Sequence, residues 1–286
     1  TPTAGKYERL WSQLKLLGWD INKKAFYASY VQTEWIENGD GYKKEVITGY
    51  KHVEHLKKRL TQFGAVFMKT EEVIEQKIFL KITNEYKFFI KHNYLELDTR
   101  NLVRFKDDSD FEGEDVTPRV ELIGDNSLTK TLYCRQLCGQ WHKEKLEAFR
   151  DLLESTEDRL IVFYNFNEEL TRLRKICESL NREVSFVNGS GRSMYAYECV
   201  DNSVTFVQYQ AGAMGGNYQK ANKIVYFTLP LGKGSCDLWE QSKKRIHRIG
   251  QNRPCFYYYL LVKGSFEERN LAALQEGKEL TDELFT

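Results

Sequence analysis

The sequence lacks the features that would place it in a membrane. Its 286 residues contain no long uncharged apolar run, so we expect no transmembrane helix, and the first residues show no signal pattern. The formal net charge is only +1, so the chain as a whole offers no strong field to a nucleic acid, and any such surface must be local. The chain begins with Thr1-Pro2 inside an apparent motif, and we therefore expect a piece of a longer protein.

Closely spaced cysteine pairs are also missing. The six cysteines are scattered and form no Cys-x-x-Cys pair, which favours reduced thiols over a disulfide framework. Cys134, Cys138 and His142 recur at intervals of four residues, as zinc ligands on a helix could. A structural zinc ion needs a fourth ligand, and none is evident nearby. Buried small thiols are therefore the favoured interpretation, and we predict no metal ligand.

The chain contains enough apolar surface for a packed core. Hydrophobic residues make up 41% and aromatic residues 14%, which suits one large or two modest domains. Helical periodicity predicts helices over 7–17 and 51–63, separated by a polar, aromatic-rich stretch. Partial alternation predicts a strand over 73–82, and Thr83 is placed to cap the helix that follows. The acidic run at 106–115 is typical of a surface loop.

After Asn126, strands and helices alternate regularly. Short apolar strands are expected at 159–164, 183–187, 203–209, 223–229 and 255–262, with helices at 128–137, 142–153, 168–180, 236–249 and from 266 onward. This order predicts an α/β fold with a parallel sheet covered on both faces, preceded by a mostly helical segment. Ligands of such folds bind beyond the carboxyl ends of the strands, where Asn165, Asn188-Gly189-Ser190 and the Gln208–Asn217 loop stand.

Two arginines and a glutamine form the most informative pattern. On one helix over 236–249, Gln241, Arg245 and Arg248 fall at i, i+4 and i+7 and project from one face. A guanidinium is a planar, permanently charged fork that matches phosphate oxygens. A solvated basic helix is the plain alternative.

These residues carry a family resemblance. Gln241-x-x-x-Arg245-x-His-Arg248-Ile-Gly-Gln resembles the last helicase motif of the Swi/Snf-type ATPases, the double-stranded-DNA translocases of helicase superfamily two. Residues 204–225 resemble the motif in which a strand runs into a glycine loop ending Gly-x-Asn, and 160–166 resemble the strand that opens the second RecA-like lobe. The first residues resemble the end of the first lobe's Thr-Pro motif.

The resemblance implies a RecA-like three-layer fold and a domain plan. Residues 1–82 would be the tail of the first RecA-like lobe with a helical insertion, and 83–286 the second lobe. Within the latter, 83–140 would form a helical protrusion and 263–286 a brace that returns to the first lobe. The Tyr257-Tyr-Tyr259 run is expected in the sheet core.

The resemblance also implies site residues. Arg245 and Arg248 would act as arginine fingers on ATP, with Gln241 supporting them and Arg248 making the more direct contact. Gly215 and Asn217 would touch nucleotide. The residues that the resemblance and the strand ends suggest for DNA are Asn165, Asn188, Gly189, Ser190, Arg192 and Gln208. Tyr209, Tyr218 and Gln219 depart from the family pattern, and the stretch over 189–202 is shorter than usual.

A complete ATP site is not expected on this chain. Splitting ATP requires a phosphate cradle such as Gly-x-x-x-x-Gly-Lys-Ser/Thr and a carboxylate for Mg²⁺, and Gly232-Lys-Gly-Ser235 is too short to serve. We therefore expect an inactive half-site whose Mg²⁺ ligands lie in the missing part of the first lobe. The expected partners are duplex DNA and that lobe, with no membrane.

Two other functions remain open. One is an RNA helicase lobe, which Ile-Gly-Gln after His-Arg disfavours. The other is a non-catalytic protein-interaction module, which would not need the three polar side chains at 241, 245 and 248. The short insertions favour a minimal bacterial or phage member, in the cytoplasm, or in the nucleus if the organism is eukaryotic.

Overall fold

The computed structural model describes residues 7–16, 18–37, 43–63, 72–98, 119–212, 216–248, 250–278 and 280. The chain divides into two compact units, Thr1–Lys69 and Thr70–Thr286, each of which is considered by itself. The expected loop at 106–115, Thr1-Pro2 and Gly215 lie outside the described residues. Among the helices that are described, none is long and apolar enough to cross a membrane.

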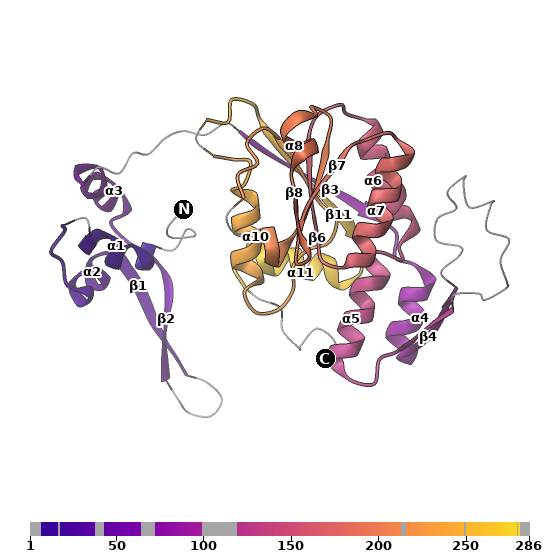
Figure 1. The fold of residues 1–286 in the computed structure, drawn as a ribbon. Helices are drawn as coiled ribbons and strands as arrows, with labels where there is room; N and C mark the ends of the chain where they lie inside the picture. The colour runs from indigo at the N-terminus through magenta and orange to yellow at the C-terminus, as the bar shows by residue number, and fades with distance from the viewer. Residues whose placement is uncertain are drawn as a thin grey trace. The chain divides into compact units, whose positions relative to one another are not determined.

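The first unit is a small mixed structure of helices and a β-hairpin (Figure 1). Its elements are the 3-10 turn η1 (Tyr7–Arg9), α1 (Leu10–Leu16), α2 (Lys23–Tyr30), β1 (Val31–Glu37), β2 (Lys43–Tyr50) and α3 (Val53–Gln62). The helices expected at 7–17 and 51–63 are confirmed. Helices make up most of the regular structure of this segment, as expected, and the structure adds β1 and β2, which pair as an antiparallel ribbon. Leu14, Phe26 and Leu56 are almost fully buried and form the centre of this unit's core.

The second unit contains the alternating elements. They are β3 (Val73–Leu80), α4 (Asn84–His92), β4 (Tyr94–Asp98), β5 (Arg119–Ile123), α5 (Ser127–Cys138), α6 (Lys143–Glu154), β6 (Leu160–Tyr164), α7 (Asn167–Ser179), β7 (Val184–Asn188), β8 (Gly191–Ser193), α8 (Tyr195–Cys199), β9 (Val204–Gln208), α9 (Tyr209–Gly212), β10 (Lys223–Tyr226), α10 (Ser235–Lys243), β11 (Cys255–Val262) and α11 (Phe266–Gln275). All the strands and helices expected after Asn126 are present. The structure adds β8, α8 and α9, and α10 is shorter than expected.

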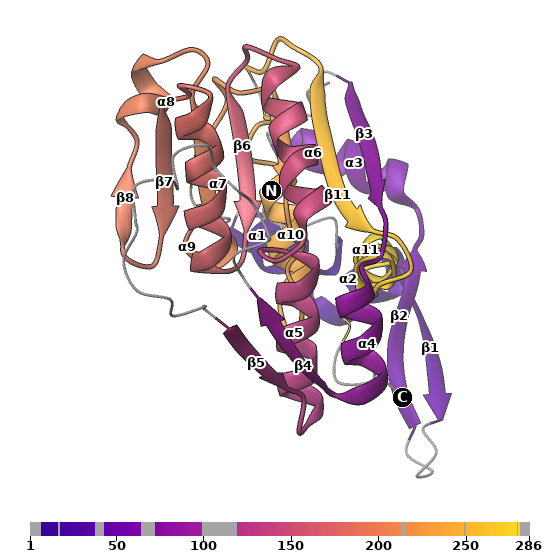
Figure 2. The same cartoon turned by 90° about the vertical axis from the view of Figure 1, so that its right-hand side faces the viewer.

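A seven-stranded sheet in the order β3-β11-β10-β6-β9-β7-β8 forms the centre of this unit. All neighbouring pairs are parallel except β7 and β8. Successive residues of β6 point to opposite faces, as strand geometry requires. Leu160 and Val162 pack in the cluster that contains α6 and α7, whereas Ile161 and Phe163 pack in the cluster that contains α10 and α11. The predicted three-layer α/β fold is therefore confirmed (Figures 1 and 2).

The strand β3 belongs to the second compact unit. It pairs in parallel with β11 along its whole length, from Cys255 opposite Val73 to Val262 opposite Leu80. This pairing makes β3 an edge strand of the seven-stranded sheet, and the two compact units divide between Lys69 and Thr70.

The described residues of the segment expected as a helical protrusion form two helices and a two-stranded sheet. β4 pairs antiparallel with β5, and both lie beside α4 and α5 (Figure 2). Thr83 caps α4 by accepting a hydrogen bond from the Tyr86 N–H, as expected. Phe89, Leu122 and Leu137 are buried in the same cluster as Phe266, so this part packs on the end of β11 and the start of α11. The described part of the expected brace thus belongs to this unit's own core.

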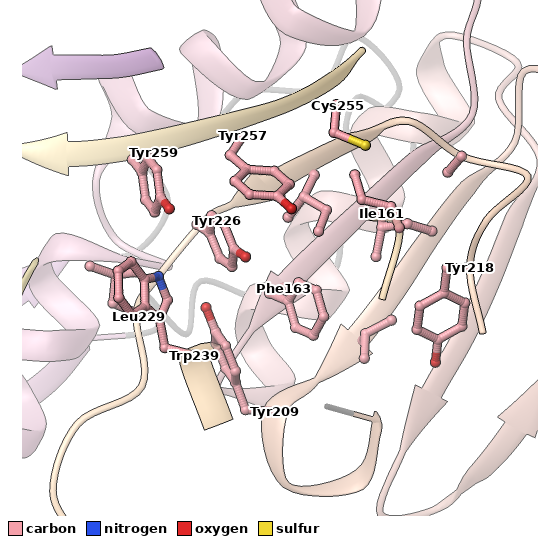
Figure 3. Close-up of a cluster of buried hydrophobic side chains, with 14 of the residues drawn as sticks. Ile161, Phe163, Tyr209, Tyr218, Tyr226, Leu229, Trp239, Cys255, Tyr257 and Tyr259 are labelled. Carbon is pink, nitrogen blue, oxygen red and sulfur yellow. The ribbon is translucent and has the colours of Figure 1, made fainter. Parts of the chain in front are cut away.

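Tyrosines fill one face of the sheet (Figure 3). Tyr257 and Tyr259 are almost fully buried, which confirms the expectation that this run belongs to the core. The Tyr226 and Tyr259 rings stack with centroids 4.8 Å apart. The Tyr257 hydroxyl donates to the Lys243 carbonyl over 2.6 Å, so the polar end of this buried ring is satisfied.

Candidate functional site

The carboxyl ends of three neighbouring parallel strands bring the expected polar residues together. β6, β9 and β7 are adjacent, and they end at Tyr164, Gln208 and Asn188. The Gln208 side chain joins the three ends, because its Nε2 donates to the Asn165 carbonyl over 3.0 Å and its Oε1 accepts from the Gly189 N–H over 3.2 Å. The sequence-based placement of these residues at one edge of the sheet is therefore correct.

Most of the amide groups at this edge are used within the protein. The Asn165 Nδ2 donates to the Thr228 hydroxyl over 2.9 Å and to the Leu229 carbonyl over 3.0 Å. The Asn188 Oδ1 accepts from the backbone N–H and the hydroxyl of Ser190, each over 3.0 Å. These contacts fix the loops after β6 and β7. They leave Gly189 and Ser190 exposed to solvent at the tip.

A buried carboxylate, which sequence reasoning missed, organises the same edge. Glu169 is fully buried in α7, and its Oε2 accepts from the N–H groups of Asn165 and Phe166 and from the Thr228 hydroxyl. Burial raises the pKa of Glu169, and the two backbone N–H groups oppose that rise. Its bond to the Phe166 N–H, three residues earlier, is one half of a capping box, but the sequence did not indicate it because the N-cap residue is a phenylalanine instead of Ser or Thr.

The expected catalytic trio does lie together, although not on one helix. α10 ends at Lys243, so the helix expected to reach residue 249 is corrected. Beyond it, the Arg245 carbonyl accepts a hydrogen bond from the Tyr218 N–H instead of from a backbone N–H four residues later, as it would in a continued helix. The Arg245 guanidinium donates to the Gly216 carbonyl over 3.2 Å and to the Gln241 Oε1 over 3.4 Å. Burial lowers the pKa of Arg245 first, and the nearby charge of Arg248 lowers it further.

The turn after α10 is held by a second glutamine. The Gln251 side chain is buried and its Nε2 donates to the carbonyls of Gln219, Ala221 and Ile246 at 2.9–3.3 Å. Gly250 precedes it with φ of +96°, a conformation that favours glycine. Gly250 and Gln251 therefore have a structural role, which is to hold the turn that follows Arg248.

Two arginines act on one buried tyrosine, and a third lies near one of these two. Burial raises the pKa of Tyr218, whereas the charges of Arg192 and Arg245 lower it, which places both guanidiniums close to this ring. Arg192 and Arg248 are exposed. Within the described residues, Arg192, Arg245 and Arg248 form no salt bridge, and the buried Arg245 Nε has no hydrogen-bond partner. The result is a local concentration of unneutralised positive charge beside the Gly216-Asn217 loop.

Tyr209 and Tyr218, two of the three departures from the pattern that the sequence resembles, are core residues, whereas Gln219 is half-buried. Tyr209 is buried and its hydroxyl donates to the Thr228 carbonyl over 3.1 Å. Tyr218 packs so closely on Gly216 that a Cβ there would lie 2.4 Å from the ring. Figure 3 shows both rings within the buried cluster. Asn217 is exposed and its side chain donates to Gln219 over 3.2 Å, while Gly215 lies outside the described residues.

The cysteine and histidine pattern has a structural explanation. Cys134 and Cys138 are buried in α5, and burial raises the pKa of Cys134 to about 12. His142 lies beyond the end of that helix and caps α6 by accepting from the Lys145 N–H. Its other ring nitrogen lies 2.9 Å from the Lys81 carbonyl. No group of three or more potential metal ligands occurs among the described residues.

Comparison with known proteins yields distant relatives. No family model matches the sequence. The chain is 27% identical over 118 residues to the ATP-dependent helicase fft3 of Schizosaccharomyces pombe, a match that covers 39% of this chain and 12% of the relative. It is 28% identical over 137 residues to the DNA repair and recombination protein RAD54-like of Danio rerio, with 44% and 18% covered. It is also 28% identical over 141 residues to the SWI/SNF-related matrix-associated actin-dependent regulator of chromatin subfamily A-like protein 1 of Xenopus tropicalis, with 46% and 14% covered.

The matched stretch spans less than a fifth of each of these relatives, all of which are eukaryotic. They therefore lend no support to the expected bacterial or phage origin. Among solved structures, the C-terminal part of the Fun30 ATPase domain aligns with a TM-score of 0.40 at 19% identity, covering 49% of this chain and 47% of that one. The C-terminal domain of the DEAD-box protein Dbp5 aligns with a TM-score of 0.41 at 16% identity, covering 47% and 78%. The sequence relatives are ATP-dependent helicases and DNA repair proteins, and the similarity is to a part of each.

Proposed function

We propose that this chain provides the second, RecA-like lobe of an ATP-dependent translocase that acts on duplex DNA. The observation that carries the proposal is the group formed by Arg192, Arg245 and Arg248 beside the Gly216-Asn217 loop, because these arginines form no salt bridge within the described residues. The similarity to ATP-dependent helicases and DNA repair proteins supports the same reading.

The position of Arg248 suits a polyphosphate that approaches from outside the lobe. Arg248 is exposed, so it can turn its donors towards an added anion, and the neighbouring Arg245 adds a second positive charge. We assign Arg248 the role of an arginine finger, which stabilises negative charge that develops on a transferred phosphoryl group. Arg245, held by Gln241 and the Gly216 carbonyl, positions the loop that would carry Gly215 and Asn217 to the nucleotide.

The rest of the ATP site would come from a first lobe. This chain lacks the phosphate-binding loop in its sequence. ATP supplies the phosphoryl group that is transferred to water, and we place the Mg²⁺ ligands on the first lobe. The strand-end residues Gly189 and Ser190 and the side chain of Arg192 are proposed to contact the DNA backbone, without reading bases.

The test compares Arg248→Ala with Arg248→Lys in the protein that contains both lobes. Arg248→Ala should lower kcat for ATP hydrolysis by about 10³-fold, the lower end of the range for a lost arginine finger, and should leave ATP affinity nearly unchanged. Arg248→Lys keeps the charge but loses the planar fork, so it should recover only part of the rate. This chain alone should hydrolyse ATP at the background rate.

Loss of ATP affinity together with turnover in Arg248→Ala would assign Arg248 a ground-state role and would refute the finger. The same experiment also tests the two alternative functions, an RNA helicase lobe and a protein-interaction module. Stronger stimulation of turnover by single-stranded RNA than by duplex DNA would favour the RNA helicase lobe, and full activity of Arg248→Ala would favour an interaction module.

A further inference from the structure

The first unit has a net positive charge that the net charge of the whole chain does not reveal. Residues 1–69 contain 12 lysines and arginines against 7 acidic residues, a net charge of +5, whereas residues 70–286 contain 30 against 34, a net charge of −4. The near-zero charge of the chain is therefore the sum of a basic first unit and an acidic second one. A basic compact unit attracts polyanions over the distance of a Debye length.

The positive charge borders a hollow in this unit. A hollow of about 940 Å³ lies between α2 and the β1–β2 hairpin, and Lys23, Lys24 and Lys51 line it together with Thr33 and Thr48. We call it the α2–hairpin hollow. None of the three lysines forms a salt bridge with another described residue. Ammonium and hydroxyl groups gathered in one hollow suit phosphate oxygens.

The hairpin beside the hollow exposes large apolar side chains. Every residue of β1 after Val31 is exposed, on both faces of the ribbon. Trp35 is 67% exposed, and Ile36 is 48% exposed. Alternate residues of a strand share a face, so Trp35 lies on the same side as Thr33, which lines the hollow. An exposed indole beside a cationic hollow provides a surface on which an unpaired base can stack.

Opposite charges are separated within the hollow. Glu34 and Glu45 also line it, and both belong to the hairpin strands, with Glu45 directly opposite Trp35. The lysines come from α2 and from the segment after β2. A bound strand would therefore place its phosphates along α2 and its bases over the ribbon, where no cation is needed.

We propose that the α2–hairpin hollow and Trp35 form a binding site for single-stranded nucleic acid. Lys23, Lys24 and Lys51 hold phosphates, and Trp35 stacks on a base. The site belongs to the first unit alone and does not depend on the arginine cluster of the second unit or on ATP.

The test measures binding of a fluorescein-labelled oligothymidylate to the full chain, without nucleotide, between 50 and 400 mM salt. Lys23→Gln/Lys24→Gln/Lys51→Gln should reduce the slope of log affinity against log salt by about 2, since each phosphate contact to a single strand contributes about 0.7. This corresponds to a loss on the order of 100-fold at 0.1 M salt. Lys58→Gln/Lys87→Gln/Lys91→Gln, which removes the same charge from exposed positions outside the hollow, should change the slope by less than 0.5.

Trp35 tests the stacking half of the proposal. Trp35→Ala should weaken binding by about 5- to 150-fold, the range for one base stacked on an aromatic side chain, without changing the salt slope. Trp35→Phe should retain most of the affinity. Because Trp35 is exposed, the melting temperature of each variant should match that of the wild type and verifies that it is folded. Equal weakening by the two lysine triples, or wild-type binding by Trp35→Ala, would overturn the site, and neither result would bear on the role of Arg248.

Discussion

Removing the cation of one buried ion pair should destabilise the second unit by an amount that depends on pH. Lys145 in α6 is fully buried, Glu267 in α11 is 2% exposed, and their charged atoms lie 2.6 Å apart. The Glu267 carboxylate also accepts from the Val262 N–H over 2.9 Å. Burial raises the pKa of Glu267, while the charge of Lys145 opposes that rise. In Lys145→Met the opposing charge is lost, so the carboxyl must become protonated in the folded state.

The cost follows from the pKa of the unfolded chain. Protonating a carboxyl with an unfolded pKa of about 4.3 costs about 3.7 kcal/mol at pH 7 and about 1 kcal/mol at pH 5. For a unit of this size the loss at pH 7 lowers the melting temperature by about 7–15 °C. The charge of Lys145 also opposes the rise that burial causes in the pKa of the nearby Glu169, so its removal adds to the loss.

Urea denaturation at pH 5 and pH 7 measures both values. Lys143→Met is the matched control, because Lys143 lies on the same helix in an exposed pair with Glu147 at 3.7 Å and should change stability by less than about 0.5 kcal/mol. The double variant Lys145→Met/Glu267→Gln removes both charges and should recover most of the loss. A deficit of Lys145→Met that stays the same at both pH values would refute the reasoning.

Two further predictions concern the carboxyl edge of the sheet. Gly139→Ala should cost about 1–3 kcal/mol, because a Cβ would lie 2.3 Å from the Glu169 Oε1 and 3.1 Å from the Thr228 Cγ2, and thermal melting measures the loss. Glu169→Gln should alter how stability depends on pH. Because the pKa of Glu169 is raised in the folded state, its contribution is fully present below about pH 4.5 and is lost as pH rises through the folded pKa. The wild type should therefore exceed the variant in stability by more at pH 4.5 than at pH 8, and a constant difference would contradict the assignment.

Continuous apolar runs made much of the sheet predictable. The expected bounds of β11 match the structure, and those of β6 differ by one residue, because a strand buried on both faces is apolar throughout. The β1–β2 hairpin was missed although Asn38-Gly39 separates two runs rich in β-branched and aromatic residues, which is a hairpin signal. Its alternation is obscured because the ribbon exposes both faces, so no apolar side marks it.

Hydrogen bonds between residues far apart in the sequence determine features that the local sequence pattern could not predict. α10 ends before Arg245 because the Tyr218 N–H takes the Arg245 carbonyl and the Gln251 side chain takes the Ile246 carbonyl. The Glu169 network joins Thr228, 59 positions away in sequence. Local periodicity carries no information on either contact. The sequence therefore predicted that Asn165, Asn188 and Gln208 lie at one edge of the sheet, but it did not indicate which of their side chains form hydrogen bonds within the protein.

These internal hydrogen bonds determine which variant best tests the proposed DNA contacts. Replacing Asn165 would remove two hydrogen bonds that hold Thr228 and Leu229 in the core, so its effect on DNA would be mixed with a loss of stability. Gln208→Ala instead removes a bridge between two loops, to the Asn165 carbonyl and the Gly189 N–H, at a cost of about 1–2 kcal/mol for two partly exposed hydrogen bonds. Because Gly189 leads into the exposed tip proposed to contact DNA, loosening that tip should lower the ratio of DNA-stimulated to basal ATP turnover in the protein that contains both lobes. Steady-state hydrolysis at saturating ATP, with and without duplex DNA at matched salt, gives this ratio. An unchanged ratio, with both rates reduced alike, would assign the bridge to the folding of the lobe and would remove the tip from the DNA interface.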